Sequence, residues 1–94
     1  MKVIVIFEEC HGFIGVAKDI RSAFDFLLYD KWITEKTYFP IEADDDSDFV
    51  MLEDLRKRFG FDNLLDTLVF MWENNKQWFE DTFAFYTEDV YGST

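Results

Sequence analysis

Residues 3–7 read Val3-Ile4-Val5-Ile6-Phe7, and this run of β-branched and aromatic side chains decides the fold class. Every position is apolar, so both faces of the predicted strand are apolar, which is typical of a central strand covered on both sides. Glu8 and Glu9 end the run, which is far too short to span a membrane or to form the core of a signal peptide. We therefore expect a strand in the middle of a sheet, in a protein that is neither exported nor anchored.

Two further strands are predicted to flank this one. Residues Phe13 to Ala17 form the second strand, after a turn at Cys10-His11-Gly12. At the other end of the chain, side chains alternate between the two sides of a predicted strand from Phe83 to Tyr91. Pairing this last strand with the first puts the most apolar strand in the middle. The expected sheet is three-stranded and antiparallel, in the order 2-1-3.

Three helices are predicted between the second and the last strand, because apolar residues recur there at helical spacing. The helices are expected to run from Asp19 to about Lys31, from Ser47 or Asp48 to Gly60, and from Asp62 to Asn74-Asn75. Between the first two helices, Trp32 to Ile41 is expected to be a loop or a short edge strand, with Pro40 closing it. A short turn carrying Trp78 and Phe79 is expected to follow the third helix.

Together these elements predict one α+β domain over residues 1–94, with the order ββαααβ and three helices packed on one face of the sheet. Aromatic residues make up 20% of the chain, so few side chains can fill the core of so small a domain. The residues expected in this core are Ile4, Ile6, Phe24, Leu27, Leu28, Leu55, Leu68, Val69 and Phe85.

The sequence offers little for nucleophilic catalysis by a Cys–His or Ser–His pair. His11 is the only histidine and Cys10 the only cysteine, and adjacent side chains of a strand or turn tend to point apart. Zinc sites use three or four ligands at characteristic spacing, which this pair does not supply. We assign the pair no role and expect no enzyme activity, no metal and no cofactor. With a single cysteine there is no internal disulfide, which favours a reducing cytoplasm.

A run of aspartates resembles part of a calcium-binding loop. Asp44, Asp46 and Asp48 have the spacing of its first three ligands. The position of the sharp-turn glycine holds Phe49, however, and the position of the bidentate glutamate holds Leu55. The run is therefore interpreted as an exposed acidic loop.

Negative charge is concentrated in the C-terminal part of the chain. The net charge is -11, and residues 1–40 contribute only -1 of it, with 6 acidic and 5 basic residues. Residues 59–94 contribute -6, with 7 acidic residues and 1 basic residue. Such a field repels nucleic acid and attracts basic surfaces, which inside cells are often nucleic-acid-binding grooves. Acidic residues can also serve only to keep an aromatic-rich domain in solution.

The chain resembles the short proteins carried by phages and mobile elements of Gram-positive bacteria, which include acidic inhibitors of CRISPR nucleases and of restriction or DNA-repair enzymes. The resemblance covers length, charge and element order: the leading hairpin from Val3 to Ala17, a helix containing Ala23-Phe24-Asp25-Phe26-Leu27-Leu28, and the closing strand from Phe83 to Tyr91. It implies an inhibitor in the bacterial cytoplasm that presents carboxylates in place of phosphates to a nuclease. These inhibitors share no signature, so the resemblance transfers no functional residue.

The expected partner is a bacterial nuclease or another basic nucleic-acid-binding protein, with no direct binding of nucleic acid and no membrane. The residues predicted to contact it are acidic apart from one tryptophan: Asp44, Asp45, Asp46, Asp48, Glu53, Asp54, Trp78, Glu80 and Asp81. The alternative is a non-inhibitory interaction or self-association module of phage origin, monomeric or homodimeric. Its exposed aromatic patch would consist of Trp32, Tyr38, Trp78 and Tyr91.

Overall fold

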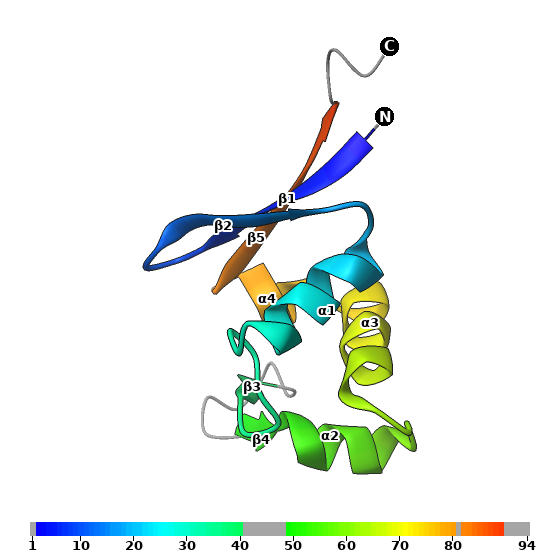
Figure 1. The fold of residues 1–94 in the computed structure, drawn as a ribbon. Coiled ribbons are helices and arrows are strands. Elements are labelled where there is room, and N and C mark those ends of the chain that lie inside the picture. The colour runs from blue at the N-terminus through cyan, green and yellow to red at the C-terminus, as the bar shows by residue number, and fades with distance from the viewer. Residues whose placement is uncertain (1, 41–48, 81, 90–94) are drawn as a thin grey trace.

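A three-stranded antiparallel sheet lies at one end of the molecule (Figure 1), in a computed structural model that describes residues 2–40, 49–80 and 82–89. Its strands are β1 (Lys2–Glu8), β2 (Gly12–Ala17) and β5 (Phe83–Asp89), in the order β2-β1-β5. The predicted sheet, its order and its central strand are thus confirmed. The last predicted residues of the closing strand, 90 and 91, lie outside the described part of the chain.

The register of the sheet separates two faces. Ile6 pairs with Gly15 on β2 and with Phe85 on β5, and these positions belong to the face that contributes to the core. Val5 pairs with Val16 and Tyr86, which belong to the opposite face. A bulge between Ile6 and Phe7 shifts the pairing of β1 with β2 near the turn.

The first and third predicted helices are present as α1 (Ile20–Tyr29) and α3 (Leu64–Asn74). The side chain of Asp19 accepts a hydrogen bond from the backbone N–H of Ser22 at 2.7 Å, which confirms the predicted cap of α1. The predicted cap of α3 at Asp62 is wrong by one residue. Asn63 has the extended backbone of a cap, and its amide oxygen accepts from the N–H of Asp66 at 2.8 Å.

The second predicted helix starts later than expected. Residues Phe49–Met51 form strand β4, which pairs with β3 (Tyr38–Pro40) in a second, two-stranded antiparallel sheet. Helix α2 (Leu52–Phe59) therefore begins only after this strand, and its N-cap is Met51 rather than Ser47 or Asp48. The edge-strand interpretation of residues 32–41 is confirmed for the three residues of β3. At the other end, Gly60 has a φ of 78° and ends α2 as predicted.

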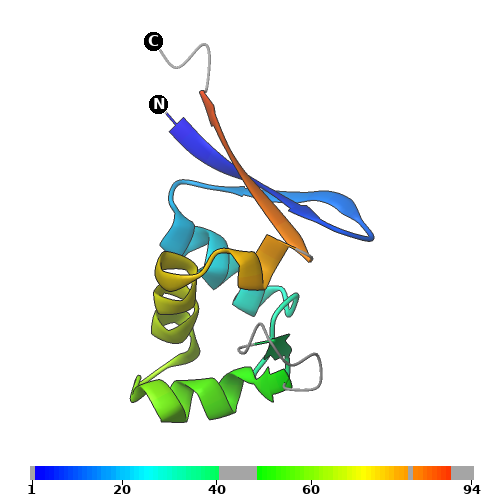
Figure 2. The same cartoon turned by 180° about the vertical axis from the view of Figure 1, so that it is seen from behind.

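A fourth short helix, α4 (Gln77–Glu80), replaces the turn predicted after α3. Figure 2, the view from behind, shows it between α3 and the start of β5. The described residues therefore form four helices instead of the predicted three, and the additional helix is a single turn. Asn75 starts this turn, because its side-chain oxygen accepts from the N–H of Gln77 at 3.1 Å and its carbonyl accepts from Trp78.

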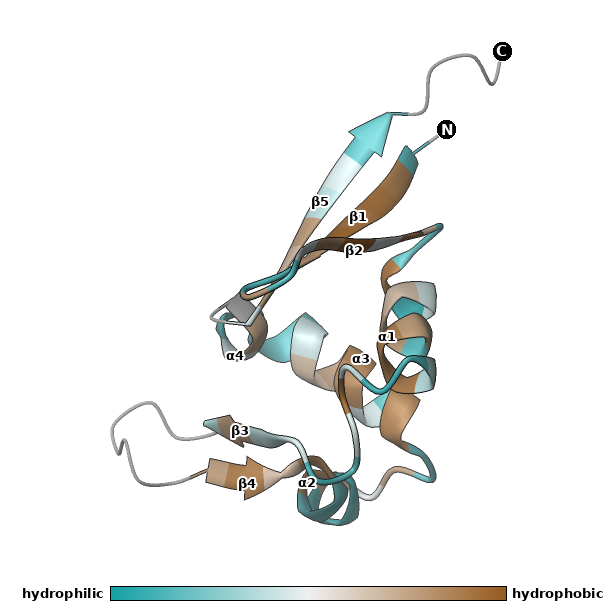
Figure 3. Ribbon diagram, turned by 60° about the vertical axis from the view of Figure 1, so that its left-hand side comes forward, coloured by the Kyte–Doolittle hydropathy of each residue, from teal (hydrophilic) through white to brown (hydrophobic). Residues whose placement is uncertain are grey.

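The core combines residues of the sheet and of the helices. Of the nine residues predicted for it, Ile6, Phe24, Leu27, Leu55 and Leu68 are buried. The other four, Ile4, Leu28, Val69 and Phe85, are partly buried and pack against the same cluster. Figure 3 shows that β1 and β2 are hydrophobic along most of their length, whereas the end of β5 is hydrophilic.

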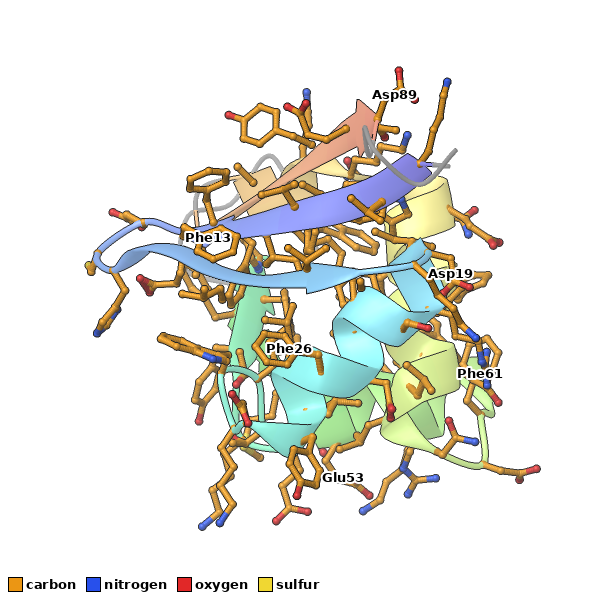
Figure 4. All side chains as sticks on the ribbon, turned by 45° about the horizontal axis from the view of Figure 1, so that its top comes forward. Phe13, Asp19, Phe26, Glu53, Phe61 and Asp89 are labelled. Carbon is orange, nitrogen blue, oxygen red and sulfur yellow. The ribbon has the colours of Figure 1, made fainter. Side chains whose placement is uncertain are left out.

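Gly15 brings β2 close to α1. A side chain at this position would place its Cβ 2.8 Å from Cε2 of Phe26. Figure 4 shows Phe26 on α1 beside β2. The absence of a side chain at Gly15 therefore lets the Phe26 ring pack directly against the strand backbone.

Candidate functional site

A cavity of about 170 Å³ opens between the β3–β4 hairpin, α4 and the start of β5. Most of the residues that line it are aromatic, and we call it the aromatic cavity. Its aromatic residues are Trp32, Tyr38, Phe39, Phe49, Trp78, Phe79 and Phe83. They come from five separate segments of the chain, so the cavity exists only in the folded protein.

The floor of the aromatic cavity belongs to the hydrophobic core. Phe39, Phe79 and Phe83 line it and are at most 5% exposed. The ring centroids of Phe39 and Phe79 are 5.3 Å apart, and Phe79 in turn lies 5.0 Å from Phe24 of α1. Because these rings are held by the core, the floor is rigid.

The wall of the cavity includes Trp32, which is fixed by the end of α1. Lys31 has a φ of 62°, and this left-handed residue turns the chain so that the N–H of Trp32 donates to the carbonyl of Leu27 at 2.9 Å. The His11 ring packs edge-on against Trp32, with centroids 5.0 Å apart. Trp32 is therefore held by both the helix end and the β1–β2 turn.

The rim is formed by the short sheet. Tyr38 on β3 and Phe49 on β4 line the cavity and are 59% and 53% exposed. Pro40 pairs with Phe49 across the two strands and also lines the cavity. The aromatic cavity therefore runs from buried rings at its floor to exposed rings at its mouth.

The predicted acidic contact residues fall mostly outside the described part of the chain. Asp44, Asp45, Asp46 and Asp48 lie in segment 41–48, and Asp81 and the side chain of Glu80 are likewise not described. The residues at the ends of segment 41–48 are described, however. Pro40 and Phe49 both line the aromatic cavity, as do Phe79 and Thr82, which flank Glu80 and Asp81 in the sequence.

Of the two predicted contact residues on α2, Glu53 and Asp54, only Asp54 has no ion pair within the helix. Glu53 is half-buried and forms an ion pair with Arg56 at 2.6 Å within the helix. This hydrogen bond holds the pKa of Glu53 below its usual value. Asp54 is exposed, but Lys57 and Arg58 follow on the same helix and are also exposed. Figure 4 shows Glu53 on α2, at the end of the molecule away from the three-stranded sheet.

Three of the four residues of the predicted aromatic patch come together at this cavity. Trp32, Tyr38 and Trp78 all line it, whereas Tyr91 lies outside the described residues. Only Tyr38 is exposed, and both tryptophans are half-buried. In the folded protein these three residues therefore line a recess, whereas the sequence suggested an exposed patch.

Sequence reasoning missed two features. Phe49 falls within the second predicted helix, although it lies on β4 at the mouth of the cavity. The face of the sheet opposite the core was also missed, where Phe13 and Tyr86 are 59% and 55% exposed. The alternation of side chains along β5 gave a signal for Tyr86, because it places the Tyr86 side chain on the face of the sheet that does not carry Phe85.

His11 and Cys10 organise the turn between β1 and β2. The carboxylate of Glu8 accepts hydrogen bonds from the N–H groups of Cys10 and His11 at 2.6 and 2.9 Å and from Nδ1 of His11 at 2.9 Å. The hydrogen bond from the His11 ring is the main cause that lowers the pKa of Glu8. These contacts close a turn and give no nucleophile–base arrangement.

In the described ranges, no three His, Cys, Asp or Glu residues lie together in a way that could hold a metal ion. Nor does any helix among these residues have the length and apolar character needed to cross a membrane. No known protein family, curated protein or solved structure matches the chain.

Proposed function

We propose that this protein is a non-catalytic inhibitor of phage or mobile-element origin that binds the basic groove of a nucleic-acid-binding enzyme in the cytoplasm of its bacterial host. The first candidate is a CRISPR nuclease, whose binding or cleavage of DNA it would block. The observation that carries the proposal is the charge asymmetry: of the net -11, only -1 comes from residues 1–40. Carboxylates would take the place of DNA phosphates in the groove.

Support for the location of the contact comes from the chain around the aromatic cavity. In the sequence, Asp48 directly precedes the rim residue Phe49, and Glu80 directly follows the floor residue Phe79. Charge mainly accelerates encounter between proteins, whereas tight binding needs desolvated contacts at the centre of the interface. The acidic segments would therefore attract the partner, and the aromatic rings would hold it.

The ion pair on α2 refines the set of contact residues. Glu53 already has a partner in Arg56, so the free carboxylate of Asp54 is the better candidate on this helix.

We also propose that the helices pack against one face of the three-stranded sheet. The exposure of Phe13, Val16 and Tyr86 on the opposite face supports this arrangement.

The test is charge reversal combined with a cleavage assay. The protein is used to capture CRISPR effectors and other nucleic-acid enzymes from a bacterial lysate, and purified candidates are then assayed for DNA cleavage. Replacing Asp45, Asp46 and Asp48 by lysine should abolish inhibition without unfolding the domain. Binding of the wild-type protein should weaken steeply as salt rises, because screening shortens the reach of the charges.

A matched control separates the position of the charges from their number. Glu9, Asp25 and Glu73 are exposed, and replacing them by lysine changes the net charge by the same amount. This control should still inhibit. Full inhibition by the Asp45, Asp46 and Asp48 variant, or capture of no nucleic-acid enzyme, would refute the proposed mechanism and leave the acidic residues a role in solubility.

A second candidate function is self-association or partner binding through apolar surface, without inhibition. The exposed side chains Phe13, Val16 and Tyr86 on one face of the sheet favour it, because apolar side chains clustered on a surface often mark an interface. Phe7 packs edge-on against both Phe13 and Tyr86, at centroid distances of 6.0 and 5.5 Å. These contacts join the aromatic rings of this face into one cluster.

A further inference from the structure

We infer that the aromatic cavity is the site at which a partner protein inserts a single arginine side chain. The inference rests on the proposed function, because a groove that binds DNA is lined with arginine and lysine. It goes further by naming the contact and the chemical group that is recognised.

The size of the cavity favours one side chain over a small-molecule ligand. Its volume is about 170 Å³. Sites for drug-sized ligands usually have volumes of ~300–1,000 Å³. The rigid floor of Phe39, Phe79 and Phe83 and the exposed rim of Tyr38 and Phe49 give the recess a closed end and an open mouth.

The chemistry of the lining favours a cation. None of the described residues that line the cavity is charged, and seven of them offer aromatic rings. The faces of such rings attract cations, most strongly when the cation is shielded from water. The hydroxyl oxygens of Thr37 and Thr82, which also line the cavity, can accept hydrogen bonds from a guanidinium group. Arginine is favoured over lysine because its guanidinium is planar, weakly hydrated and able to stack on rings.

Charge complementarity points to the same occupant. The net charge of -11 attracts a basic partner over long distances. None of the nine lysine and arginine residues of the chain lines the cavity. Lys76 lies over the ring of Trp72, with Nζ 5.2 Å from the centroid, and Trp72 does not line the aromatic cavity. The cation that enters the cavity is therefore expected to come from another molecule.

The test uses short capped peptides of glycine with one central arginine, citrulline, lysine or leucine. Citrulline has nearly the shape of arginine but no charge. Binding is followed by tryptophan fluorescence, since Trp32 and Trp78 line the cavity, and by backbone NMR shifts of the full-length protein. We expect the arginine peptide to bind about tenfold more tightly than the citrulline peptide, with the largest shifts at residues lining the cavity.

Two tyrosine variants provide the matched comparison. Tyr38→Leu removes an exposed ring at the rim, so it should weaken arginine binding several-fold without unfolding the protein. Tyr29→Leu removes an 84% exposed ring on α1 that does not line the cavity, and it should leave binding unchanged. Equal binding of the arginine and citrulline peptides, shifts outside the cavity, or no binding at millimolar peptide would overturn the inference.

The test of the cavity inference can fail independently of the test of the proposed function. Inhibition that is lost on charge reversal, together with no arginine binding, would remove the cavity inference and leave the inhibitor in place. Selective arginine binding by a protein that inhibits no nuclease would remove the inhibitor proposal and leave the arginine site in place.

Discussion

Glu8 shows what one carboxylate does in this small domain. It lies at the end of the central strand β1, opposite Phe83 of β5, and its side chain closes the turn that leads into β2. The His11 ring that donates to it also packs against Trp32 in the wall of the aromatic cavity. The turn and the cavity are thus connected through two side chains.

Replacing His11 by alanine should raise the pKa of Glu8. The hydrogen bond from the His11 ring is the main reason why this pKa lies below its usual 4.5 in the folded protein. Because the folded pKa is lowered, the interaction stabilises the fold above the unfolded pKa and is lost as the pH falls through the folded pKa. The variant should therefore be less stable than wild type at neutral pH, and the difference should shrink below about pH 4.5.

NMR titration of the side-chain carboxyl groups measures this change directly. Glu53 serves as the internal control, because its pKa is lowered by Arg56 and should not respond to the loss of His11. An unchanged Glu8 titration in the His11→Ala variant would contradict the assignment.

At the scale of elements, α3 connects α1 with α2. It packs against α1 and α2, and Arg21 of α1 forms an ion pair with Asp66 of α3 at 2.8 Å. Leu68 and Met71, which lie on one side of this helix, are completely buried. The apolar face that the sequence predicts for α3 is therefore the face on which its packing depends.

Truncating Leu68 to alanine should lower the free energy of unfolding by ~2–5 kcal/mol, because it leaves a cavity in the core as well as removing apolar contacts. This is a large part of the stability of a small domain. Leu65→Ala is the matched control: it removes the same atoms from a partly buried side chain of the same helix, so it should cost less. Urea unfolding of both variants gives the two values. Equal losses would contradict the placement of Leu68 in the core.

At the scale of the whole molecule, the outer face of the sheet is apolar at its centre and charged at one end. Val5, Val16 and Tyr86 lie on this face, and so does Glu88, which pairs with Val3 near the end of β5. The acidic excess lies in the C-terminal part of the chain. One proposed function uses the acidic residues and the other uses the apolar centre of the sheet face, so the two predict different responses to salt.

If the sheet face mediates self-association, sedimentation at micromolar concentration should show a dimer that persists at high salt, since apolar contacts are not screened. Phe13→Asp would place a charge on this face and should dissociate the dimer, whereas Tyr29→Asp, on α1, should not. A wild-type monomer at all salt concentrations would remove the self-association candidate and leave the acidic surface as the working surface.

The sequence by itself determined the three-stranded sheet, its order and most of the core. The apolar run of β1, the alternation in β5 and the helical spacing around Phe24 and Leu68 are repeated local patterns, and burial on one side enforces each of them. The Asp19 cap and the Gly60 stop were predictable because particular residue types favour a short-range capping hydrogen bond and a left-handed backbone.

Only the tertiary structure decided the β3–β4 pairing and the aromatic cavity. A three-residue strand such as Phe49–Met51 has no period of its own, so it was indistinguishable from the start of α2 until its backbone groups paired with Tyr38–Pro40. The choice of Arg56 as partner for Glu53 likewise depends on the side-chain conformations within α2. The cavity combines rings from segments that are far apart in the sequence, and no local pattern encodes which of them meet, because their contact follows from how the core packs.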